Sequence, residues 1–487
     1  MFERSEIHFL GWGSDKNKIY NPDEIGRIEE EKMSTIVAIS TAPAIGGIGI
    51  IRLSGEKTFE IIEKIFIPKN KQKIEEIKGN SIKYGHIVDE GKIIDEVLVS
   101  YFKAPKSYTA ENMCEINSHG GILIVRKILE ICLKNGAILA EPGEFTKRAF
   151  LNGRIDLAQA ESVIDIINAK TNKEVEASVK QLEGYLSSEI SNIRKKIMDL
   201  MVDIEASIDY PEYDVEEVTY SNAIKILEDV QNHLEKLSNS FENGKIIKDG
   251  ISLAIIGRPN AGKSSLLNEF LKEERAIVTD IEGTTRDTIE EQISISGIPF
   301  KIIDTAGIRE SDDKIEKIGI EKSKKAAQNS DIILAIFDVS KPLNKEDFEI
   351  MEFIKNKKAI IILNKIDLNE NAETITELSN LGKDILKISV LEKKGIEQIY
   401  DKLTQMFNIN EINLDNENVI TNIRHKELID CAKQNAKQAI IALKSNLPVD
   451  IIAINIKEIL ENLGKITGES VSEDIIKEIF AKFCLGK

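Results

Sequence analysis

The stretch at residues 251–270, ISLAIIGRPNAGKSSLLNEF, decides the fold of the nucleotide-binding part of this chain. The apolar run at 251–256 predicts a buried strand. It leads to Gly257 and, after four residues, to Gly262-Lys263-Ser264 and an apolar-periodic segment that predicts a helix. This order predicts a phosphate-binding loop. The glycines let backbone N–H groups surround a phosphate, and the helix directs its positive N-terminal end at the same anion.

The side chains of this loop predict Mg²⁺-dependent nucleotide binding. Lys263 can reach the β- and γ-phosphates, and the hydroxyl of Ser264 can be a ligand of Mg²⁺. The predicted contact residues of the loop are Asn260, Ala261, Gly262, Lys263, Ser264 and Ser265.

Two further motifs select the nucleotide. Asp304-Thr305-Ala306-Gly307 follows the apolar run at 300–303, where an aspartate steers Mg²⁺ through water and a glycine N–H senses the γ-phosphate. Asn364-Lys365-Ile366-Asp367 follows the apolar run at 359–363. A carboxylate at Asp367 accepts both donors of the guanine Watson–Crick edge, whereas adenine offers no matching donors. The motifs together predict a GTPase domain.

Length, charge and cysteine content limit the rest of the interpretation. A chain of 487 residues predicts two to four domains. Its net charge of −17 argues against broad non-specific binding of nucleic acid, although it is compatible with a local basic patch. The cysteines (Cys114, Cys132, Cys431 and Cys484) lack metal-ligand spacing and disulfide density, which indicates a reducing cytoplasm. We see no bilayer-spanning run and no secretory signal, so we expect no membrane.

The remaining segments predict an extension and two further domains. Residues 1–32 lack periodicity and are expected to be a dispensable extension. Residues 33–152 contain short strand-like runs and one helical pattern, which predict an α+β domain. Its glycine-rich stretch at 46–49 lacks the Lys-Ser of a phosphate loop and is expected to be a tight turn between strands.

Two long helical segments flank the GTPase domain. Residues 153–249 and 409–487 have apolar side chains at helical spacing, and 223–241 predict one amphipathic helix. We expect both segments to pack together as one discontinuous helical domain, with the GTPase domain inserted at 250–408.

With these motifs in place, the chain from Ser34 to Lys487 resembles the tRNA modification GTPase family called TrmE or MnmE. The resemblance is carried by GRPNAGKSS, GTTRD at 283–287, the stretch at 142–161, IDYP at 208–211 and the terminal FCLGK. It implies an N-terminal domain similar to folate-dependent aminomethyltransferases, which also dimerises, a discontinuous helical domain and an inserted Ras-like GTPase domain.

The resemblance also implies an activity and partners. In this family, GTP hydrolysis supports an FAD-binding partner, GidA or MnmG, in a heterotetramer. Together they add a (carboxymethyl)aminomethyl group to carbon 5 of the wobble uridine of certain tRNAs. The one-carbon unit comes from 5-formyl- or 5,10-methylene-tetrahydrofolate. An alternative from a different class is a GTP-switched binding protein for ribosome assembly.

For the GTPase domain, the resemblance implies specific residue roles. Ile308 stands where Ras-like proteins carry the water-orienting glutamine, so the family's catalytic glutamate, matching Glu316, takes that role. Potassium would be held by Asn260, Thr279, Ile281 and Thr284, and Mg²⁺ by Ser264 and Thr285. The contact residues of the first switch are Thr279, Asp280, Ile281, Glu282, Gly283, Thr284 and Thr285. Ser389 would contact the base, in a Ser-Val-Leu sequence that lacks the usual long polar side chain.

For the N-terminal domain, the resemblance implies a folate pocket. Its residues would be Arg52, Glu115, Arg154 and the terminal Lys487. The arginines could pair with the glutamate carboxylates of folate or hold its pterin, and sequence reasoning leaves both assignments open. Cys484 matches the family's terminal cysteine, as either a catalytic or a structural residue.

Overall fold

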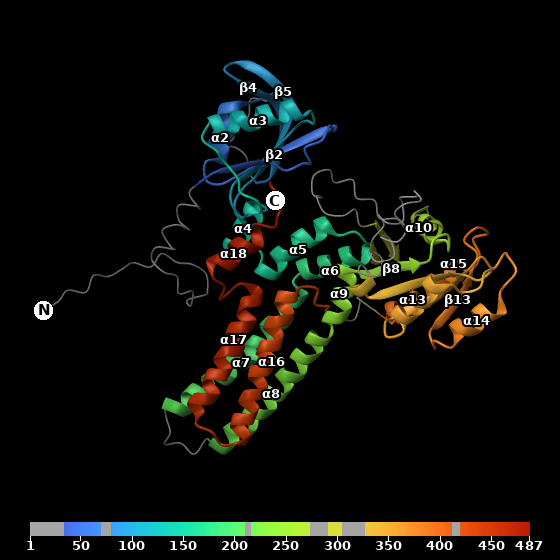
Figure 1. Ribbon diagram of the computed structural model, residues 1–487. Helices are drawn as coiled ribbons and strands as arrows, with labels where there is room; N and C mark the ends of the chain where they lie inside the picture. Colours follow the sequence, from blue (N-terminus) through green and yellow to red (C-terminus); the bar gives the residue numbers. More distant parts are fainter. Residues whose placement is uncertain (1–33, 70–78, 210–215, 273–290, 304–326, 412–418) are drawn as a thin grey trace. The chain divides into compact units, whose positions relative to one another are not determined.

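The computed structural model describes residues 34–69, 79–209, 216–272, 291–303, 327–411 and 419–487. Contacts divide the chain into two compact units, each described by itself below. Unit 1 contains the described residues up to Ile164 together with Ser187–Tyr220 and Ser445–Lys487. Unit 2 contains Asp165–Leu186 and Ser221–Lys444. Each unit therefore joins segments that are far apart in the sequence, as the colours of Figure 1 show.

Unit 1 contains a seven-stranded sheet. Its strands are β1 (Ile36–Ile39), β2 (Ile48–Ser54), β3 (Phe66–Pro68), β4 (Ser81–Asp89), β5 (Lys92–Phe102), β6 (Met113–His119) and β7 (Ile138–Leu139). Their spatial order is β3-β4-β5-β6-β2-β1-β7, and all neighbouring pairs are antiparallel except β1 and β7. β1, β2 and β5 contain the strand-like runs at 36–39, 49–53 and 97–101.

Two helices cover one face of this sheet. They are α2 (Thr58–Ile65) and α3 (Ile122–Lys134), and their buried side chains join those of the strands in one core cluster. Alternation along β1 separates the two faces, because Val37 belongs to this cluster and Ile36 and Ala38 belong to another. The second cluster includes Phe145 of α4 (Glu144–Leu151), which covers the opposite face beside β1. The predicted α+β domain is thus confirmed.

Away from α4, the second face of the sheet carries exposed apolar side chains. Ile82 and Tyr84 on β4 are 67% and 41% exposed, and Leu98 on β5 is 46% exposed. Tyr84 is the cross-strand partner of Leu98, so these side chains are neighbours on one face. Three large apolar side chains grouped in this way leave an apolar face on the described single chain.

The glycine-rich stretch at 46–49 is not a tight turn, which corrects the sequence interpretation. Residues 40–47 form a longer connection between β1 and β2, and Ile48 and Gly49 already belong to β2. Gly46 N donates to Gly120 O, and Gly120 N donates to Gly47 O, each over 3.3 Å. A Cβ at Gly120 would lie 2.3 Å from Gly46 O, so the two glycine-rich segments approach too closely for a side chain at this position.

Helices complete unit 1. They are the first residues of α5 (Leu157–Asn168), most of α7 (Tyr185–Asp209), α17 (Val449–Thr467) and α18 (Glu473–Phe480). α18 packs on α4 and α5 through a cluster that includes Ala149, Leu157 and Phe480. The C-terminal helices therefore share a core with residues that follow the N-terminal sheet. Most of α8 and all of α16 belong to unit 2, so the bounds predicted for one discontinuous helical domain stay a prediction.

Unit 2 contains a six-stranded sheet. Its strands are β8 (Ile251–Gly257), β9 (Glu291–Ile295), β10 (Ile298–Ile303), β11 (Ile332–Asp338), β12 (Ala359–Asn364) and β13 (Asp384–Ile388). The order is β13-β12-β11-β8-β10-β9, and every neighbouring pair is parallel except β9 and β10. All seven residues of β11 are buried, as expected for a parallel strand with helices on both faces.

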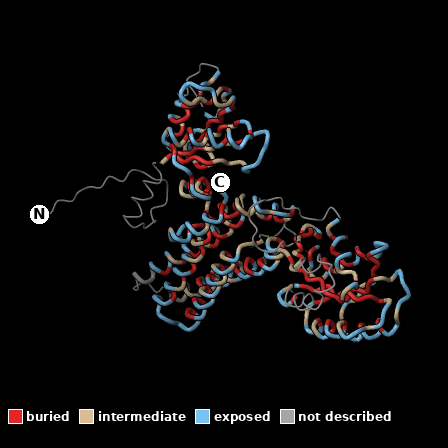
Figure 2. The backbone as a smooth tube through the Cα atoms, turned by 45° about the horizontal axis from the view of Figure 1, so that its top comes forward, coloured by how far each residue is buried: buried red, intermediate tan, exposed pale blue. Residues whose placement is uncertain are grey.

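Helices cover both faces of this sheet, and Figure 2 shows the buried strands inside their exposed surfaces. On one face lie α6 (Asn172–Leu182), α9 (Phe241–Asp249), α10 (Lys263–Lys272) and α15 (Ile396–Met406). On the other lie α13 (Lys345–Ile354) and α14 (Ala372–Ser379). The unit also contains most of α8 (Glu216–Asn239), the 3₁₀ helix η2 (Ile409–Glu411) and α16 (Ile423–Lys444). The predicted helix at 223–241 is two helices, because α8 ends at Asn239 and α9 begins at Phe241.

Gly244 lets the segment before α16 approach α9, and we predict that Gly244→Ala destabilises unit 2. A Cβ at this position would lie 1.9 Å from Ile420 O. Alanine in a helix gains about 1 kcal/mol over glycine, but overpacking costs about 1–3 kcal/mol. Because a backbone atom cannot move aside as a side chain can, we expect thermal unfolding of the full chain at a lower temperature. Asn243→Ala in the same helix is the control, and an unchanged unfolding temperature for Gly244→Ala would contradict this packing.

Within the described ranges, no helix combines the length and apolarity needed to cross a membrane.

Candidate nucleotide-binding site

A cavity of about 710 Å³ opens in unit 2 at the carboxyl ends of β8 and β12. The loop between β8 and α10 and the turn after β12 bring the predicted motifs together at this edge of the sheet. The lining residues from the motifs are Asn260, Gly262, Lys263, Ser264, Ser265, Asn364, Lys365 and Asp367. Ligands bind at this end of open parallel sheets in general, so the position supports a nucleotide site.

The two glycines of the phosphate loop are required by close approaches. Gly262 has a φ of +110°, and a Cβ there would lie 2.1 Å from Nδ2 of Asn364. A Cβ at Gly257 would lie 2.6 Å from Ile336 O on the neighbouring strand. Asn260 also has a left-handed φ, +61°, which is unusual for a residue other than glycine. The backbone conformation of the loop therefore requires glycine at 257 and 262 and a residue that tolerates a left-handed φ at 260.

Lys263 is folded back on the phosphate loop. Its Nζ donates to Gly257 O over 2.8 Å and to Arg258 O over 2.9 Å. A bound phosphate would offer this ammonium group a charged acceptor in place of two neutral carbonyls. Ser264 lies in the first turn of α10 and lines the cavity, so its hydroxyl fits the predicted role as a ligand of Mg²⁺.

Asn364 joins the phosphate loop to the base-binding side of the cavity. Its Nδ2 donates to Ala261 O over 2.9 Å, and its Oδ1 accepts from Val390 N over 3.2 Å. Ser389 is fully buried, and its hydroxyl donates to Oδ1 of Asp367 over 2.5 Å. Among the described residues, the other carboxylate oxygen of Asp367 makes no hydrogen bond, and Asp367 lines the cavity. The bond from Ser389 therefore fixes one edge of the Asp367 carboxylate beside the cavity.

Several predicted nucleotide contacts lie outside the described residues, and the structure does not place them. They are Thr279, Asp280, Ile281, Glu282, Gly283, Thr284, Thr285, Asp304, Thr305, Ala306, Gly307 and Glu316.

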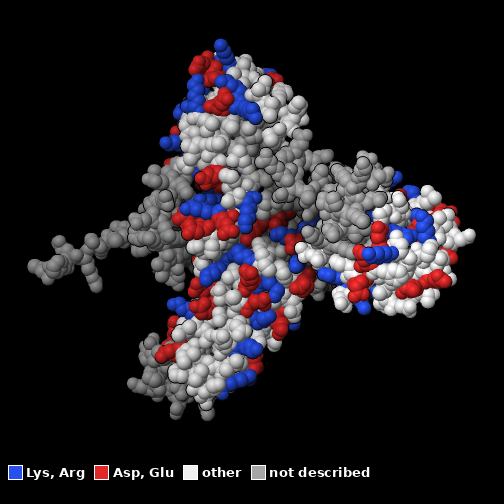
Figure 3. All heavy atoms as spheres, in the orientation of Figure 1, with Lys and Arg blue, Asp and Glu red and all other residues white. Residues whose placement is uncertain are grey.

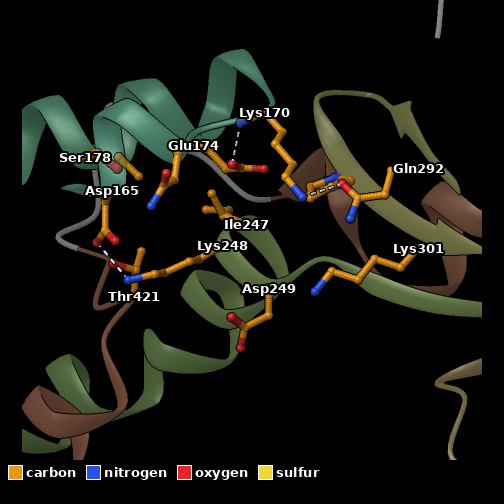
Figure 4. Close-up of a pocket in the computed structure, with 13 residues that line it drawn as sticks. Asp165, Lys170, Glu174, Ser178, Ile247, Lys248, Asp249, Gln292, Lys301 and Thr421 are labelled. Atoms are coloured by element: carbon orange, nitrogen blue, oxygen red, sulfur yellow. Dashed lines mark hydrogen bonds and ion pairs between the residues drawn. The ribbon is translucent and has the colours of Figure 1, made fainter. Parts of the chain in front are cut away.

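A second cavity in unit 2, of about 240 Å³, lies among α5, α6, α9 and the β9–β10 hairpin (Figure 4). Lys170 donates to Oε1 of Gln292 over 2.9 Å, and Lys248 pairs with Asp165 over 2.7 Å. Burial raises the pKa of Glu174, which also lines this space. Its three lysines (Lys170, Lys248 and Lys301) and three carboxylates (Asp165, Glu174 and Asp249) balance in charge. We assign it no ligand.

In unit 1, the structure brings Arg52 and Glu115 together. They are cross-strand partners on β2 and β6, and Nη2 of Arg52 lies 2.7 Å from Oε1 of Glu115. The Arg52 guanidinium lies 5.5 Å from the ring of Tyr108, and that of Arg154 lies 4.8 Å from the same ring. Both arginines of the predicted folate pocket thus contact one aromatic side chain.

Sequence reasoning missed the aromatic part of this site. The ring of Phe145 lies 5.6 Å from the Arg52 guanidinium, and Tyr108 shares a hydrogen bond of 2.9 Å with Thr146. Tyr108 lies in a connection and Phe145 in a helix, and no local pattern distinguishes them from other aromatic residues. Only their distance from the arginines does so.

The C-terminal residues reach the same region of unit 1. Gly486 O accepts from Oγ of Ser40 over 3.0 Å and from Nη1 of Arg52 over 3.4 Å. Gly486 has a φ of +86°, and a Cβ there would lie 2.3 Å from Ile39 O. Gly486 lies between Cys484 and Lys487, so this contact brings the C-terminal segment to Arg52, and the roles implied for Cys484 and Lys487 stay predictions.

The thiols differ in exposure. Cys484 and Cys431 are exposed, whereas Cys114 and Cys132 are buried. Burial raises the pKa of Cys132 to about 12 and raises that of Cys114 as well. Because the thiolate is the reactive form, the buried pair is unsuited to nucleophilic chemistry, whereas Cys484 is exposed and lies two residues before Gly486.

The sheet of unit 2, its phosphate loop and the oriented Asp367 define a P-loop protein of the guanine-nucleotide-binding class. Two family models match the chain, "GTP-binding protein TrmE N-terminus" over residues 35–154 and "MnmE helical domain" over residues 157–484.

Relatives called "tRNA modification GTPase MnmE" match nearly the whole chain. The protein of Acetivibrio thermocellus is 48% identical over 460 residues, which cover 94% of this chain and 100% of the relative. That of Clostridioides difficile is 48% identical over 454 residues (93% and 99%), and that of Thermoanaerobacter pseudethanolicus is 50% identical over 457 residues (93% and 99%). The chain belongs to the MnmE family of tRNA modification GTPases, and the predicted family is confirmed.

Proposed function

We propose that this chain hydrolyses GTP, with Mg²⁺ and potassium as cofactors, in the modification of tRNA. The observation that carries the proposal is the Asn364 side chain, which joins the phosphate loop to the segment that orients Asp367. One side chain thereby sets the spacing between the predicted phosphate and guanine contacts. Membership of the MnmE family supports tRNA as the substrate that is modified.

In the proposed mechanism, the residues of this chain bind and orient the nucleotide. Lys263 leaves the carbonyls of Gly257 and Arg258 and donates to the β- and γ-phosphates, while the N-terminus of α10 stabilises their charge. Ser264 and Thr285 would hold Mg²⁺, which neutralises charge on the phosphates. Glu316 would orient the attacking water.

Potassium would be held by Asn260, Thr279, Ile281 and Thr284. A cation beside the β- and γ-phosphates stabilises the charge of the transition state, a role that an arginine fills in other GTPases. Asn260 supports this assignment, because it lines the cavity from within the phosphate loop.

We predict that potassium raises the steady-state rate of GTP hydrolysis at least about tenfold over sodium at equal ionic strength. The measurement uses the full chain with Mg²⁺ in both salts, and Glu316→Ala is expected to lose the stimulation. Equal rates in both salts, with GTP still hydrolysed, would remove potassium from the mechanism. Absence of any GTP hydrolysis would contradict the proposed function itself.

The site in unit 1 fits a reduced folate, 5-formyl- or 5,10-methylene-tetrahydrofolate. A folate joins a flat pterin to a glutamate with two carboxylates. Glu115 can accept N–H groups of the pterin, Tyr108 offers a ring for stacking, and the arginines can pair with carboxylates. The side chain of Arg154 makes no hydrogen bond or ion pair with the described residues, so its guanidinium can pair with an incoming anion. Lys487 would add a second cation, and Cys484 a thiol.

We predict that Arg154→Ala weakens the binding of 5-formyl-tetrahydrofolate about tenfold, because one charge-assisted contact is lost. Calorimetric titration of the full chain measures this constant. Arg126→Ala is the matched control, since Arg126 is an exposed arginine of α3, on the sheet face opposite Arg52. Equal affinities for the wild type and Arg154→Ala would place the folate elsewhere.

We also propose a homodimer through the N-terminal domain, and an FAD-binding partner of the GidA or MnmG kind in a heterotetramer. The exposed apolar face with Ile82, Tyr84 and Leu98 supports the homodimer, because a second copy would cover it. On the face in Figure 3, basic and acidic side chains are interspersed, so contacts with tRNA would be local. No observation favours the ribosome-assembly alternative over tRNA modification.

A further inference from the structure

Two buried carboxylates stand behind the nucleotide cavity without lining it. Oδ2 of Asp338 lies 2.7 Å from Nζ of Lys365, and Oδ2 of Asp347 lies 2.9 Å from Nη1 of Arg258. The carboxylate side chains are each 2% exposed. Lys365 lines the cavity and Arg258 lies within the phosphate loop, so each carboxylate contacts a residue of the binding machinery from its buried side.

Asp338 holds Lys365 in an unfavourable backbone conformation. Lys365 has a φ of +71°, in the left-handed region, which residues other than glycine adopt where surrounding contacts enforce it. The second oxygen of Asp338 accepts from N and Oγ of Ser340, so both oxygens of the carboxylate accept hydrogen bonds. Burial alone would raise the pKa of Asp338, but the bonds from Lys365 and Ser340 outweigh it and lower that pKa. Asp338 is therefore charged at neutral pH.

Asp347 holds the phosphate loop from a helix N-terminus. Its Oδ2 accepts from Arg258 and from Asn344 N, and Asp347 N donates to Oδ1 of Asn344, which together form the capping box of α13. Arg258 O is also one of the two carbonyls that hold Lys263. The position of α13 thus sets the position of a phosphate-loop residue.

Both carboxylates belong to one short segment, residues 338–347, between β11 and the first turn of α13. Val339 N within this segment also donates to Asn364 O over 3.0 Å. The segment therefore contacts the phosphate loop on one side and the guanine-binding turn on the other. We propose that Asp338 and Asp347 are positioning residues that fix the spacing of these two nucleotide-binding elements. This inference rests on the proposed GTP-binding function and assigns residues to it that no motif contains.

The first test is the affinity of the full chain for a fluorescent GDP analogue. Asp338→Asn removes the charge that holds Lys365, and we expect the Kd to rise about tenfold. KM for GTP should rise in parallel, and kcat at saturating GTP should stay within about twofold, because a positioning contact acts on binding. Asp384→Asn is the control, since Asp384 pairs with Lys402 over 2.7 Å in the same unit, away from the cavity. An unchanged Kd for Asp338→Asn would overturn the inference.

The second test asks whether each carboxylate acts through its partner. In a Lys365→Met background, Asp338→Asn should add no further loss of affinity, and in an Arg258→Met background Asp347→Asn should add none. Additive losses would show a general structural role and overturn the inference. If the wild type binds no GDP, the proposed function fails instead, so the two failures are distinct.

A milder variant covers the case in which Asp338→Asn does not fold. Ser340→Ala removes one of the hydrogen bonds to Asp338 and keeps its charge. It should raise the Kd about threefold while circular dichroism and the unfolding temperature stay near those of the wild type. A folded Ser340→Ala protein with the wild-type Kd would count against a positioning role for Asp338.

Discussion

Asp367→Asn is expected to change the nucleotide preference from GTP to xanthosine triphosphate by about a thousandfold or more. Ser389 donates to Oδ1 of Asp367 and accepts from Glu392 N, which fixes the hydroxyl as the donor. In the variant, the amide oxygen keeps the bond to Ser389, so the amide NH₂ group takes the position of the other carboxylate oxygen and faces the base.

This change in donor and acceptor predicts the reversal. A carboxylate accepts the two N–H donors of guanine, and each charge-assisted bond contributes about 1.5–3 kcal/mol. An NH₂ group facing those donors loses both bonds, whereas it donates to the oxo group at C2 of xanthine. Competition between the two triphosphates for a fluorescent GDP analogue measures the preference. If Asp367→Asn kept its preference for GTP, Asp367 would not be the residue that contacts guanine.

The nucleotide-binding strands could be predicted from the sequence because parallel strands buried on both faces are continuous apolar runs. The run at 251–256 is β8 (Ile251–Gly257), and the run at 359–363 is β12 (Ala359–Asn364). The loop after β8 could be predicted as well, since its glycines and Lys263 are adjacent in the sequence. In such a motif, residues that are adjacent in the sequence also form the site together, so the sequence alone predicts their arrangement.

Residues that act from a distance could not be predicted in this way. Asp338 and Asp347 lie outside every motif, and an aspartate at the end of a strand or in the first turn of a helix has an ordinary capping role. Tyr108 is another example, because its ring meets two arginines that come from β2 and from the residues after α4. Such contacts depend on tertiary packing, and a single sequence does not report them.

The glycine-rich stretch at 46–49 shows how a local rule fails. Composition indicated a tight turn, but residues 46–47 lie against Gly120, which is far away in the sequence, and this contact leaves no room for a Cβ at Gly120. Within the stretch itself, a Cβ at Gly49 would lie 2.3 Å from the Val125 side chain of α3. A glycine is required either by a local backbone angle or by a distant neighbour, and the sequence alone does not say which.

Gly262→Ala is expected to lower the affinity for GDP and GTP at least about a hundredfold. The new Cβ would lie 2.1 Å from Nδ2 of Asn364, and the φ of +110° is unfavourable for alanine. Asn364 would have to move, which breaks its bonds to Ala261 O and from Val390 N. Overpacking costs about 1–3 kcal/mol, and a buried amide without its partners costs about 1–3 kcal/mol more. The phosphate loop and the guanine-binding segment would then no longer be connected by the Asn364 side chain.

A matched variant separates steric contact from backbone strain. Gly382 also has a positive φ, +64°, but a Cβ there would meet no atom within 4 Å. Gly382→Ala should therefore carry backbone strain alone and leave the Kd for GDP nearly unchanged, whereas Gly262→Ala should lose binding while the chain stays folded. Because both glycines lie in unit 2, a general loss of stability would affect the two variants alike. A Kd for Gly262→Ala within about threefold of the wild type would contradict this prediction. It would mean that nucleotide binding does not need the hydrogen bonds by which Asn364 connects the phosphate loop to the segment beside Asp367.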